Sequence, residues 1–313
     1  MYKRQEYTAT VAMPSSRHVR ITRIAISPRL TTRIFDGNGN GFGPSVPGTG
    51  RRILRSMPDP PANPPGEGEA ASWRVQHLTS IDSTNRLVLD LAREGEPAGF
   101  VAVADHQTAG RGRLGRSWEA EPGSSLLVSV LLRPDLPAER LHLLTLAAGL
   151  SLADAVGAVA GVTAGLKWPN DLVVDDRKLA GLLAEADVAA GAARAVVIGA
   201  GCNLTADAFP PELAHQATSV ELEAGVPVDR DALLDAFLAA LAGRLDDLDA
   251  VLDDARTRSA TLGRHVRVEL PGDQVLEGAA TALADDGSLI VRDDAGHEHA
   301  VAVGDVVHLR VSG

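Results

Sequence analysis

The stretch Gln-Thr-Ala-Gly-Arg-Gly-Arg-Leu-Gly-Arg-Ser-Trp, residues 107–118, combines three glycines with three arginines. Glycine lets the backbone approach a ligand closely, and arginine supplies a permanent positive charge with forked donors for phosphate or carboxylate. The apolar runs on either side, residues 100–104 and 126–132, have the composition of strands. The pattern predicts an anion-binding loop that joins two strands.

The glycines at positions 110, 112 and 115 also fit the dinucleotide-binding motif Gly-x-Gly-x-x-Gly. That motif needs a helix directly after the glycines, whereas Pro122, Gly123 and a second strand-like run follow here. A kinase loop is excluded because no His-Arg-Asp or Asp-Phe-Gly occurs downstream. A disordered Arg/Gly tract that binds RNA is disfavoured by the flanking apolar strands.

Composition places the chain among cytoplasmic proteins. Of its 313 residues only Cys202 is a cysteine, which excludes an intrachain disulfide and suits a reducing compartment. We expect no membrane span, because no apolar run approaches about 20 residues. The net charge is -11, yet the first 56 residues hold ten Lys or Arg and two Asp or Glu. The acidic remainder argues against nucleic acid as a partner.

Residues 1–70 lack helical or strand periodicity and are rich in Gly, Pro and Asn in parts. Such composition buries too little apolar surface to offset the entropy of ordering, so we expect a disordered extension. Two alternatives are an Arg-rich organellar targeting peptide and a translation start at Met57.

The chain from Trp73 onward alternates strand-like and helical patterns. A helix over residues 85–93 is expected to be capped by Asp82, Ser83 or Thr84, and Asp229 is a plausible cap for a later helix. The other expected elements are strands over residues 73–78 and 195–200 and long helices over 138–160 and 228–256.

Residues 165–185 form the second informative stretch, which contains Lys-Trp-Pro-Asn-Asp from Lys167 to Asp171. Residues 172–174 and 179–185 resemble two strands joined by a tight turn, with Lys178 just after the turn. The polar cluster serves either a ligand or only a strand-entry turn capped by Asn170 and Asp171. The glycines in Gly-Ala-Gly-Cys-Asn-Leu, residues 199–204, indicate either close approach of a ligand or of another chain segment, or a bulge or turn.

From Gly263 the pattern changes to short strands over 265–270, 278–283, 288–292, 299–301 and 306–311, separated by Gly- and Asp-containing turns. Such spacing predicts a small β-barrel.

Hydrolytic sites are missing from the sequence. It contains no Gly-x-Ser-x-Gly and no His-Glu-x-x-His, and its histidines lack metal-ligand spacing. Loops rich in Lys and Arg instead favour phosphoryl or adenylyl transfer, in which positive charge and positioning stabilise the transition state. No Walker-type Gly-Lys-Ser/Thr run is present.

Taken in order, five motifs resemble those of biotin protein ligases: Ser83-Thr-Asn, Gln107 with the Arg/Gly loop, Lys167-Trp-Pro-Asn-Asp, Lys178-Leu-Ala-Gly-Leu-Leu and Gly199-Ala-Gly-Cys-Asn-Leu. The resemblance covers about residues 73–311. It implies an α+β fold similar to class II aminoacyl-tRNA synthetases, with a mixed, largely antiparallel sheet and helices over residues 71–260. A small SH3-like β-barrel over residues 261–313 would follow.

The resemblance also implies an activity. Biotin and ATP with Mg2+ would give biotinyl-5'-AMP and pyrophosphate, and a lysine of a biotin carboxyl carrier domain of an acyl-CoA carboxylase would then receive biotin. Because the segment before Trp73 lacks the winged helix-turn-helix pattern of bifunctional members, no repressor role is expected. A monomer or a homodimer fits the pattern equally well.

The family motifs assign roles to individual residues. Lys178, Arg113 and Arg111 would be catalytic, and Asp171 would bind Mg2+. Biotin would contact Ser83, Thr84, Asn85, Gln107, Gly110, Arg111, Gly112, Lys178 and Gly181. ATP and the adenylate would contact Arg113, Arg116, Trp118, Lys167, Asn170, Asp171 and Asn203.

Two rivals stay open at this stage. A lipoate ligase shares the fold but usually lacks the full Arg/Gly loop, and a noncatalytic biotin sensor would not need Lys178 and all three loop arginines. In the ligase, the loop is expected to close over the acyl-adenylate and exclude water.

Overall fold

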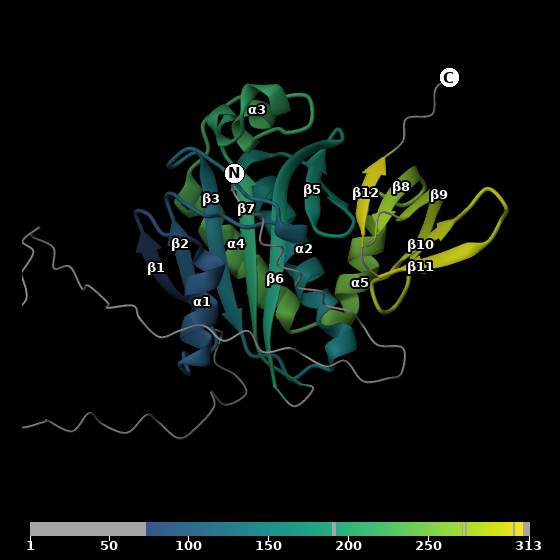
Figure 1. Ribbon diagram of the computed structural model, residues 1–313. Helices are drawn as coiled ribbons and strands as arrows, with labels where there is room; N and C mark the ends of the chain where they lie inside the picture. Colours follow the sequence, from purple (N-terminus) through teal and green to yellow (C-terminus); the bar gives the residue numbers. More distant parts are fainter. Residues whose placement is uncertain (1–72, 190–191, 271, 273, 303, 309–313) are drawn as a thin grey trace, which may run out of the picture. The chain divides into compact units, whose positions relative to one another are not determined.

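The computed structural model describes residues 73–189, 192–270, 272, 274–302 and 304–308, which form the coloured ribbon of Figure 1. The predictions for residues 1–70, namely a disordered extension, a targeting peptide or a start at Met57, lie outside the described residues.

Seven strands of the described chain form one mixed sheet in the order β1-β2-β3-β7-β6-β5-β4. β1 (Arg74–Leu78) runs parallel to β2 (Phe100–Ala104), and the other neighbouring pairs are antiparallel. α1 (Thr84–Arg93) lies between the parallel strands in the chain and provides the crossover that such a pair requires. The remaining strands are β3 (Ser125–Leu132), β4 (Gly165–Lys167), β5 (Asp171–Val174), β6 (Arg177–Ala189) and β7 (Ala192–Asn203). The predicted α+β class is confirmed.

The central strands alternate between two apolar clusters on opposite faces of the sheet. On β7, Val196 and Ile198 belong to the larger cluster, whereas Ala195 and Val197 belong to the smaller one. This alternation follows from the two-residue period of a strand. Figure 1 shows α1 on one side of the sheet and α2 (His142–Ala160) and α4 (Arg230–Leu245) on the other. Helix α1 covers only the smaller cluster, so the rest of that face of the sheet remains available for a site.

Two long helices expected from the sequence are each divided. Residues 138–160 form the 3-10 turn η2 (Ala138–Arg140) and then α2, and residues 228–256 contain α4 and α5 (Leu248–Thr257). The second division occurs where the Asp247 carboxylate accepts a hydrogen bond from the Ala250 amide, which starts a new helix. Asp229 caps α4 as predicted, whereas the N-cap residue of α1, Ser83, makes no side-chain capping bond. The short helix α3 (Val220–Ala224) and strand β4 were not predicted.

Helix α2 is long and apolar enough to span a membrane by length and composition alone, with a mean hydropathy of 1.8. However, 61% of that window is buried inside the protein, where α2 packs against α4 and α5. Burial of this kind is typical of a core helix in a folded domain.

A second sheet follows, with the strand order β11-β10-β9-β8-β12. The predicted small β domain is confirmed, but the expected closed barrel is not, because no pairing of β11 with β12 joins the two edges among the described residues. Strand spacing predicts strands, whereas closure depends on contacts between edges far apart in sequence. The strands are β8 (His265–Leu270), β9 (Gln274–Leu283), β10 (Leu289–Arg292), β11 (Glu298–Val301) and β12 (Asp305–His308).

Candidate active site

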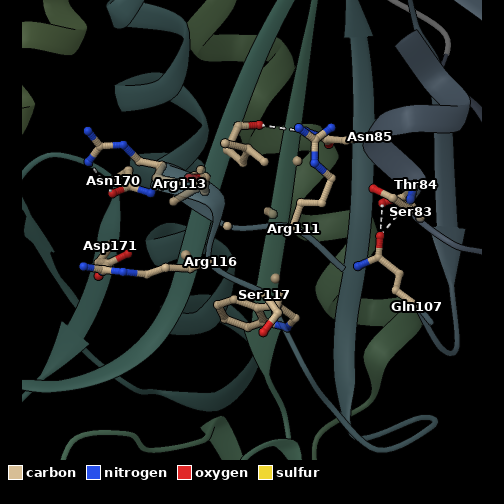
Figure 2. Close-up of a pocket in the computed structure, with 18 of the residues that line it drawn as sticks. Ser83, Thr84, Asn85, Gln107, Arg111, Arg113, Arg116, Ser117, Asn170 and Asp171 are labelled. Atoms are coloured by element: carbon tan, nitrogen blue, oxygen red, sulfur yellow. Dashed lines mark hydrogen bonds between the residues drawn. The ribbon is translucent and has the colours of Figure 1, made fainter. Parts of the chain in front are cut away.

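A pocket opens on the α1 side of the main sheet, where the central strands carry glycines (Figure 2). It holds roughly 730 Å³ of space including its mouth. Its floor comes from β6 and β7, and its walls come from the start of α1, the loop over residues 107–118 and the β5–β6 hairpin. Thirteen of the predicted site residues line it: Ser83, Thr84, Asn85, Gln107, Arg111, Gly112, Arg113, Arg116, Trp118, Asn170, Asp171, Lys178 and Gly181.

Glycines make the floor because neighbouring side chains occupy the space of a Cβ. A Cβ on Gly199 would lie 2.2 Å from Asn85 Oδ1, and one on Gly201 would lie 2.6 Å from Trp118 Cε2. Real Cβ atoms do not approach other atoms so closely, so any side chain here would displace Asn85 or Trp118. The sequence left open whether these glycines meet a ligand or another chain segment, or form a bulge or turn. They meet side chains of the pocket wall.

The deep end of the pocket is a polar network buried under α1. The backbone amide of Thr84 donates to Gln107 Oε1 at 2.7 Å, and Figure 2 shows these two side chains pointing toward one another. Ser129 Oγ lies 2.7 Å from both Thr84 Oγ1 and Asn85 Oδ1. Ser129 is fully buried on β3 and was not predicted as a site residue.

The number of hydroxyl and amide protons determines which groups donate and which accept in this network. The Asn85 amide nitrogen donates to Leu183 O and to Glu185 Oε2, so its Oδ1 can only accept. Ser129 has one hydroxyl proton, and donating it to Asn85 leaves Thr84 to supply the proton of the other 2.7 Å contact. Gln107 Oε1 then keeps the Thr84 backbone amide as its donor at 2.7 Å, and it also lies 3.0 Å from Thr84 Oγ1. The network therefore fixes the orientation of the Gln107 side-chain amide and of the Thr84 hydroxyl.

Arg111 crosses the middle of the pocket toward Glu185 on β6. Its Nη1 lies 2.9 Å from Glu185 Oε1, whose partner oxygen accepts from the Asn85 amide. The Glu185 side chain is 19% exposed, whereas that of Arg111 is 52% exposed. A half-buried carboxylate thus orients an accessible guanidinium, and a ligand carboxylate could bind the N–H donors that Glu185 leaves free.

Lys178 lies at the hairpin between β5 and β6, where Asp175 and Asp176 adopt positive φ values of 48° and 64°. Aspartate tolerates this left-handed conformation better than most residues, which explains the predicted turn. The Lys178 backbone amide donates to Gln216 O, and its carbonyl accepts from the Thr218 amide. These two bonds fix the start of β6 against residues 216–218. The Lys178 ammonium lies 2.8 Å from Asp171 Oδ1 and 5.5 Å from the centroid of the Trp118 ring. The lysine is therefore held at the pocket between a carboxylate and an aromatic face.

The Arg/Gly loop is a closed turn rather than the start of a helix. Gly112 N donates to Arg116 O at 2.7 Å, and Trp118 N donates to Gly110 O at 3.0 Å. Leu114 and Gly115 have φ values of 54° and 76°, which reverse the chain. The next regular element is strand β3, so the dinucleotide-binding interpretation is excluded by the structure as well.

Two loop arginines reach the second sheet. Arg113 Nη1 lies 3.2 Å from Asn170 Oδ1 and 3.7 Å from Asp305 Oδ1, and Arg116 forms an ion pair with Asp305. Burial lowers the pKa of Arg113, whereas Asp305 and Asp171 oppose that shift. Asp305 was not predicted as a site residue, although it lines the pocket.

Three predicted residues do not line the pocket. Gly110 serves the loop itself, since a Cβ there would lie 2.3 Å from Trp118 O. Asn203 is buried and donates to Thr218 O at 2.9 Å, and this bond joins β7 to the segment before α3. Lys167 lies on β4, where burial, followed by the charge of Lys178, lowers its pKa against the opposing effect of Asp171.

Within the part of the chain that the structure describes, no group of three His, Cys, Asp or Glu residues could hold a metal ion. The predicted ligand Asp171 and the unpredicted Asp305 are the two carboxylates that line the pocket. Cys202 is no nucleophile, because burial raises the pKa of its thiol to about 12.

Comparisons with known proteins agree with this geometry. Residues 78–203 match the model of the "Biotin/lipoate A/B protein ligase family", and residues 261–309 match the "Biotin protein ligase C terminal domain". The chain is 40% identical to a biotin–[acetyl-CoA-carboxylase] ligase of Mycobacterium tuberculosis over 78% of its own length and 92% of that protein. It is 35% identical to the Paracoccus denitrificans ligase of the same name, over 71% and 95% of the two chains.

Solved structures show the same similarity. The biotin protein ligase from Aquifex aeolicus in complex with biotin and ATP superposes with a TM-score of 0.65 and 27% identity. The match covers 76% of the present chain and 99% of the Aquifex chain.

Proposed function

The chain belongs to the biotin/lipoate A/B protein ligase family, and from this membership and its pocket we infer that it is an ATP-dependent biotin–[acetyl-CoA-carboxylase] ligase. Its substrates are biotin and ATP. The observation that carries the inference is one continuous pocket with a neutral hydrogen-bonding end near Thr84 and Gln107 and a cationic end at Lys178 and the loop arginines.

In the first step, a biotin carboxylate oxygen attacks the α-phosphorus of ATP. The bond from that phosphorus to the bridging oxygen breaks, and pyrophosphate leaves with the electron pair. Negative charge grows on the phosphoryl oxygens in the transition state, where fixed positive groups stabilise it. Lys178 would act there, and Arg113 and Arg116 would bind the phosphates of ATP.

In the second step, the amine of a carrier lysine attacks the acyl carbon of biotinyl-5'-AMP. An amide forms, AMP leaves, and the lysine nitrogen loses a proton. Arg111 and Lys178 would hold the carboxylate and its adenylate, while Trp118 and Asn170 would contact the adenine. The acceptor is a biotin carboxyl carrier domain of an acyl-CoA carboxylase.

The buried end of the pocket favours biotin over lipoate. The ureido ring of biotin has paired donors and acceptors, which Ser83, Thr84 and Gln107 would bind. The dithiolane ring of lipoate has no comparable groups, and buried polar atoms left without partners cost about 1–3 kcal/mol each. Asn85 would support biotin through this network, and Gly112 and Gly181 would let the ligand approach the backbone.

A magnesium ion fits the donor set only in part. Mg2+ commonly uses one or two carboxylates together with substrate phosphates and water. Asp171 lines the pocket and would be its protein ligand, although it also pairs with Lys178 at 2.8 Å. When bound, the ion would neutralise phosphate charge.

The location and assembly of the protein extend the proposal. It would act in the cytoplasm as a monomer or a homodimer, with neither nucleic acid nor membrane as a partner. The acidic composition after residue 56 and the single cysteine support this assignment.

The function is tested by incubating the protein with ATP, biotin and an apo carrier domain, then probing with streptavidin. Labelling that needs all three components is expected. Parallel reactions with lipoate, read with an antibody against lipoyl-lysine, should give no product. Lipoylation without biotinylation would reassign the chain to lipoate transfer, and biotin binding without labelling would make it a sensor.

A further inference from the structure

Asp305 is the residue through which the second sheet reaches the pocket. Among the pocket-lining residues it alone comes from that sheet, and it contacts two arginines of the loop. The Asp305 side chain is 18% exposed and that of Arg113 is 22% exposed. Solvent therefore screens this contact less than it screens the surface ion pairs of the protein.

The position of Asp305 is fixed by the sheet. It is the first residue of β12 and pairs with Glu269 of β8. The preceding Gly304 is packed so tightly that a Cβ there would lie 2.7 Å from Val268 Cγ1. Gly304 O also accepts a hydrogen bond from Arg113 Nη1 at 3.4 Å. The Gly304 carbonyl and the Asp305 carboxylate thus both hold the Arg113 guanidinium from a rigid part of the second sheet.

The guanidiniums of Arg113 and Arg116 each have N–H donors that Asp305 does not use. The hydrogen bonds of Arg113 with Asn170 and Gly304 and its ion pair with Asp305 use Nη1, and the ion pair of Arg116 uses Nη2. A guanidinium carries five N–H donors in a planar fork, so each arginine retains an edge for a second anion. A carboxylate at one edge and a phosphate at the other are therefore compatible.

We propose that Asp305 is a positioning residue of the nucleotide site, which holds Arg113 and Arg116 so that their unpaired edges meet the phosphates of ATP. The proposal rests on the proposed function and adds a residue of the second sheet to it. Two cations close together repel, and the carboxylate between them keeps both at the pocket. Without it, Arg116, which is 63% exposed, would turn to solvent.

The test compares Asp305→Asn with the wild type, using calorimetry with a nonhydrolysable ATP analogue, calorimetry with biotin alone, and steady-state biotinylation. Asp305→Asn should weaken binding of the analogue and raise the KM for ATP by about tenfold. Binding of biotin alone and kcat at saturating ATP should stay within about twofold. Asp305→Glu should restore part of the loss, since it keeps the charge.

Two variants control for charge and for packing between the sheets. Glu298→Gln removes a negative charge from an exposed ion pair with Arg292 in the second sheet. Arg264→Gln removes a different contact, the ion pair of the residue before β8 with Asp176 in the β5–β6 turn. Both should bind the analogue like the wild type.

Unchanged or tighter binding of the analogue by Asp305→Asn would overturn the proposal and make the carboxylate a competitor of phosphate. Equal losses for the analogue and for biotin would overturn it too, since they would indicate general damage to the pocket. Streptavidin labelling by the wild type reports separately on the proposed function.

Discussion

The indole of Trp118 lies directly on Gly201, where an added Cβ would be 2.6 Å from Cε2. The same ring covers Gly181, at 3.0 Å from the corresponding Cβ position. The Trp118 Nε1 donor is buried and has no hydrogen-bond partner among the described residues. Two glycines on neighbouring strands thus create the space for one aromatic side chain next to Lys178.

Gly201→Ala should displace the Trp118 ring and lower kcat/KM for ATP by about 10- to 100-fold, because small displacements of ligand-positioning groups are costly. Tryptophan fluorescence and initial rates measure the two effects. Gly243→Ala on α4 is the matched control, since a Cβ there meets nothing within 4 Å. It should keep full activity and gain about 0.5–1 kcal/mol in stability. Unchanged kinetics for Gly201→Ala would contradict the role given to Trp118.

Ser129→Ala should weaken biotin binding by about tenfold and destabilise the fold by about 1–3 kcal/mol, because buried partners lose their hydrogen bond. Calorimetry and urea unfolding report on the two losses. Ser125→Ala is a close control: Ser125 is equally buried on β3, but its hydroxyl has no hydrogen-bond partner among the described residues. Equal changes of biotin binding and stability in the two variants would contradict the role given to the Ser129 network.

Lys178→Ala should slow adenylate formation by about 100- to 1000-fold, the usual effect of removing a charge-stabilising donor. The protein should stay folded, because the Lys178 side chain is 40% exposed and its ion pair with Asp171 contributes at most about 1 kcal/mol. Pyrophosphate release and thermal unfolding are the measurements. Release at the wild-type rate would remove Lys178 from the mechanism.

Arg113→Ala should weaken binding of an ATP analogue by about tenfold or more while sparing biotin binding without nucleotide. The reason is spatial: Arg113 bonds to Asn170 and Asp305, away from the Thr84–Gln107 end. Calorimetry with each ligand alone decides the matter. Comparable losses for both ligands would mean that the pocket is not divided in this way.

The contact between His308 and Asp176 should make stability depend on pH. His308 Nδ1 lies 3.1 Å from Asp176 Oδ1, and its Nε2 lies 3.2 Å from Thr261 Oγ1. Burial lowers the pKa of His308, against the effect of Asp176 and with further lowering by Lys167 and Arg264.

Because the unfolded chain then binds the His308 proton more readily than the folded protein, the free energy of unfolding should fall as the pH drops below about 6.5. Hydrogen bonding by His308 lowers the pKa of Asp176, and that contribution is lost only at more acidic pH. Urea unfolding at pH 7.5 and 5.5 measures the change, which should be smaller in His308→Gln. Identical pH dependence in the two proteins would contradict the assignment.

Local patterns predicted much of the site. The loop over residues 107–118 and the turn before Lys178 could be read from glycine, arginine and aspartate spacing, since both are short-range structures. Ser129 could have been noticed as a polar residue inside an otherwise apolar strand, which calls for a hydrogen-bond partner. Its partners Thr84 and Asn85 lie more than forty residues away, so the sequence alone did not identify them.

Other features depend on long-range pairing. Arg113 and Gly304 are 191 residues apart in sequence, and Asp305 looks like an ordinary turn aspartate. Glu185 was expected only as the end of a strand, and its contact with Arg111 requires β6 to lie beside the loop. The open edge of the second sheet likewise follows from which strands pair, which five short apolar runs do not determine.

Neighbouring residues of strand β7 contribute to two different parts of the protein, the apolar core and the pocket. Val196 and Ile198 face the large apolar cluster, whereas Gly199 and Gly201 face the pocket wall. Selection for folded protein therefore acts on Val196 and Ile198, and selection for ligand chemistry acts on Gly199 and Gly201 of the same strand. Sequence drift along this strand should follow a period of two, so the pocket can change its ligand preference while the core stays as it is.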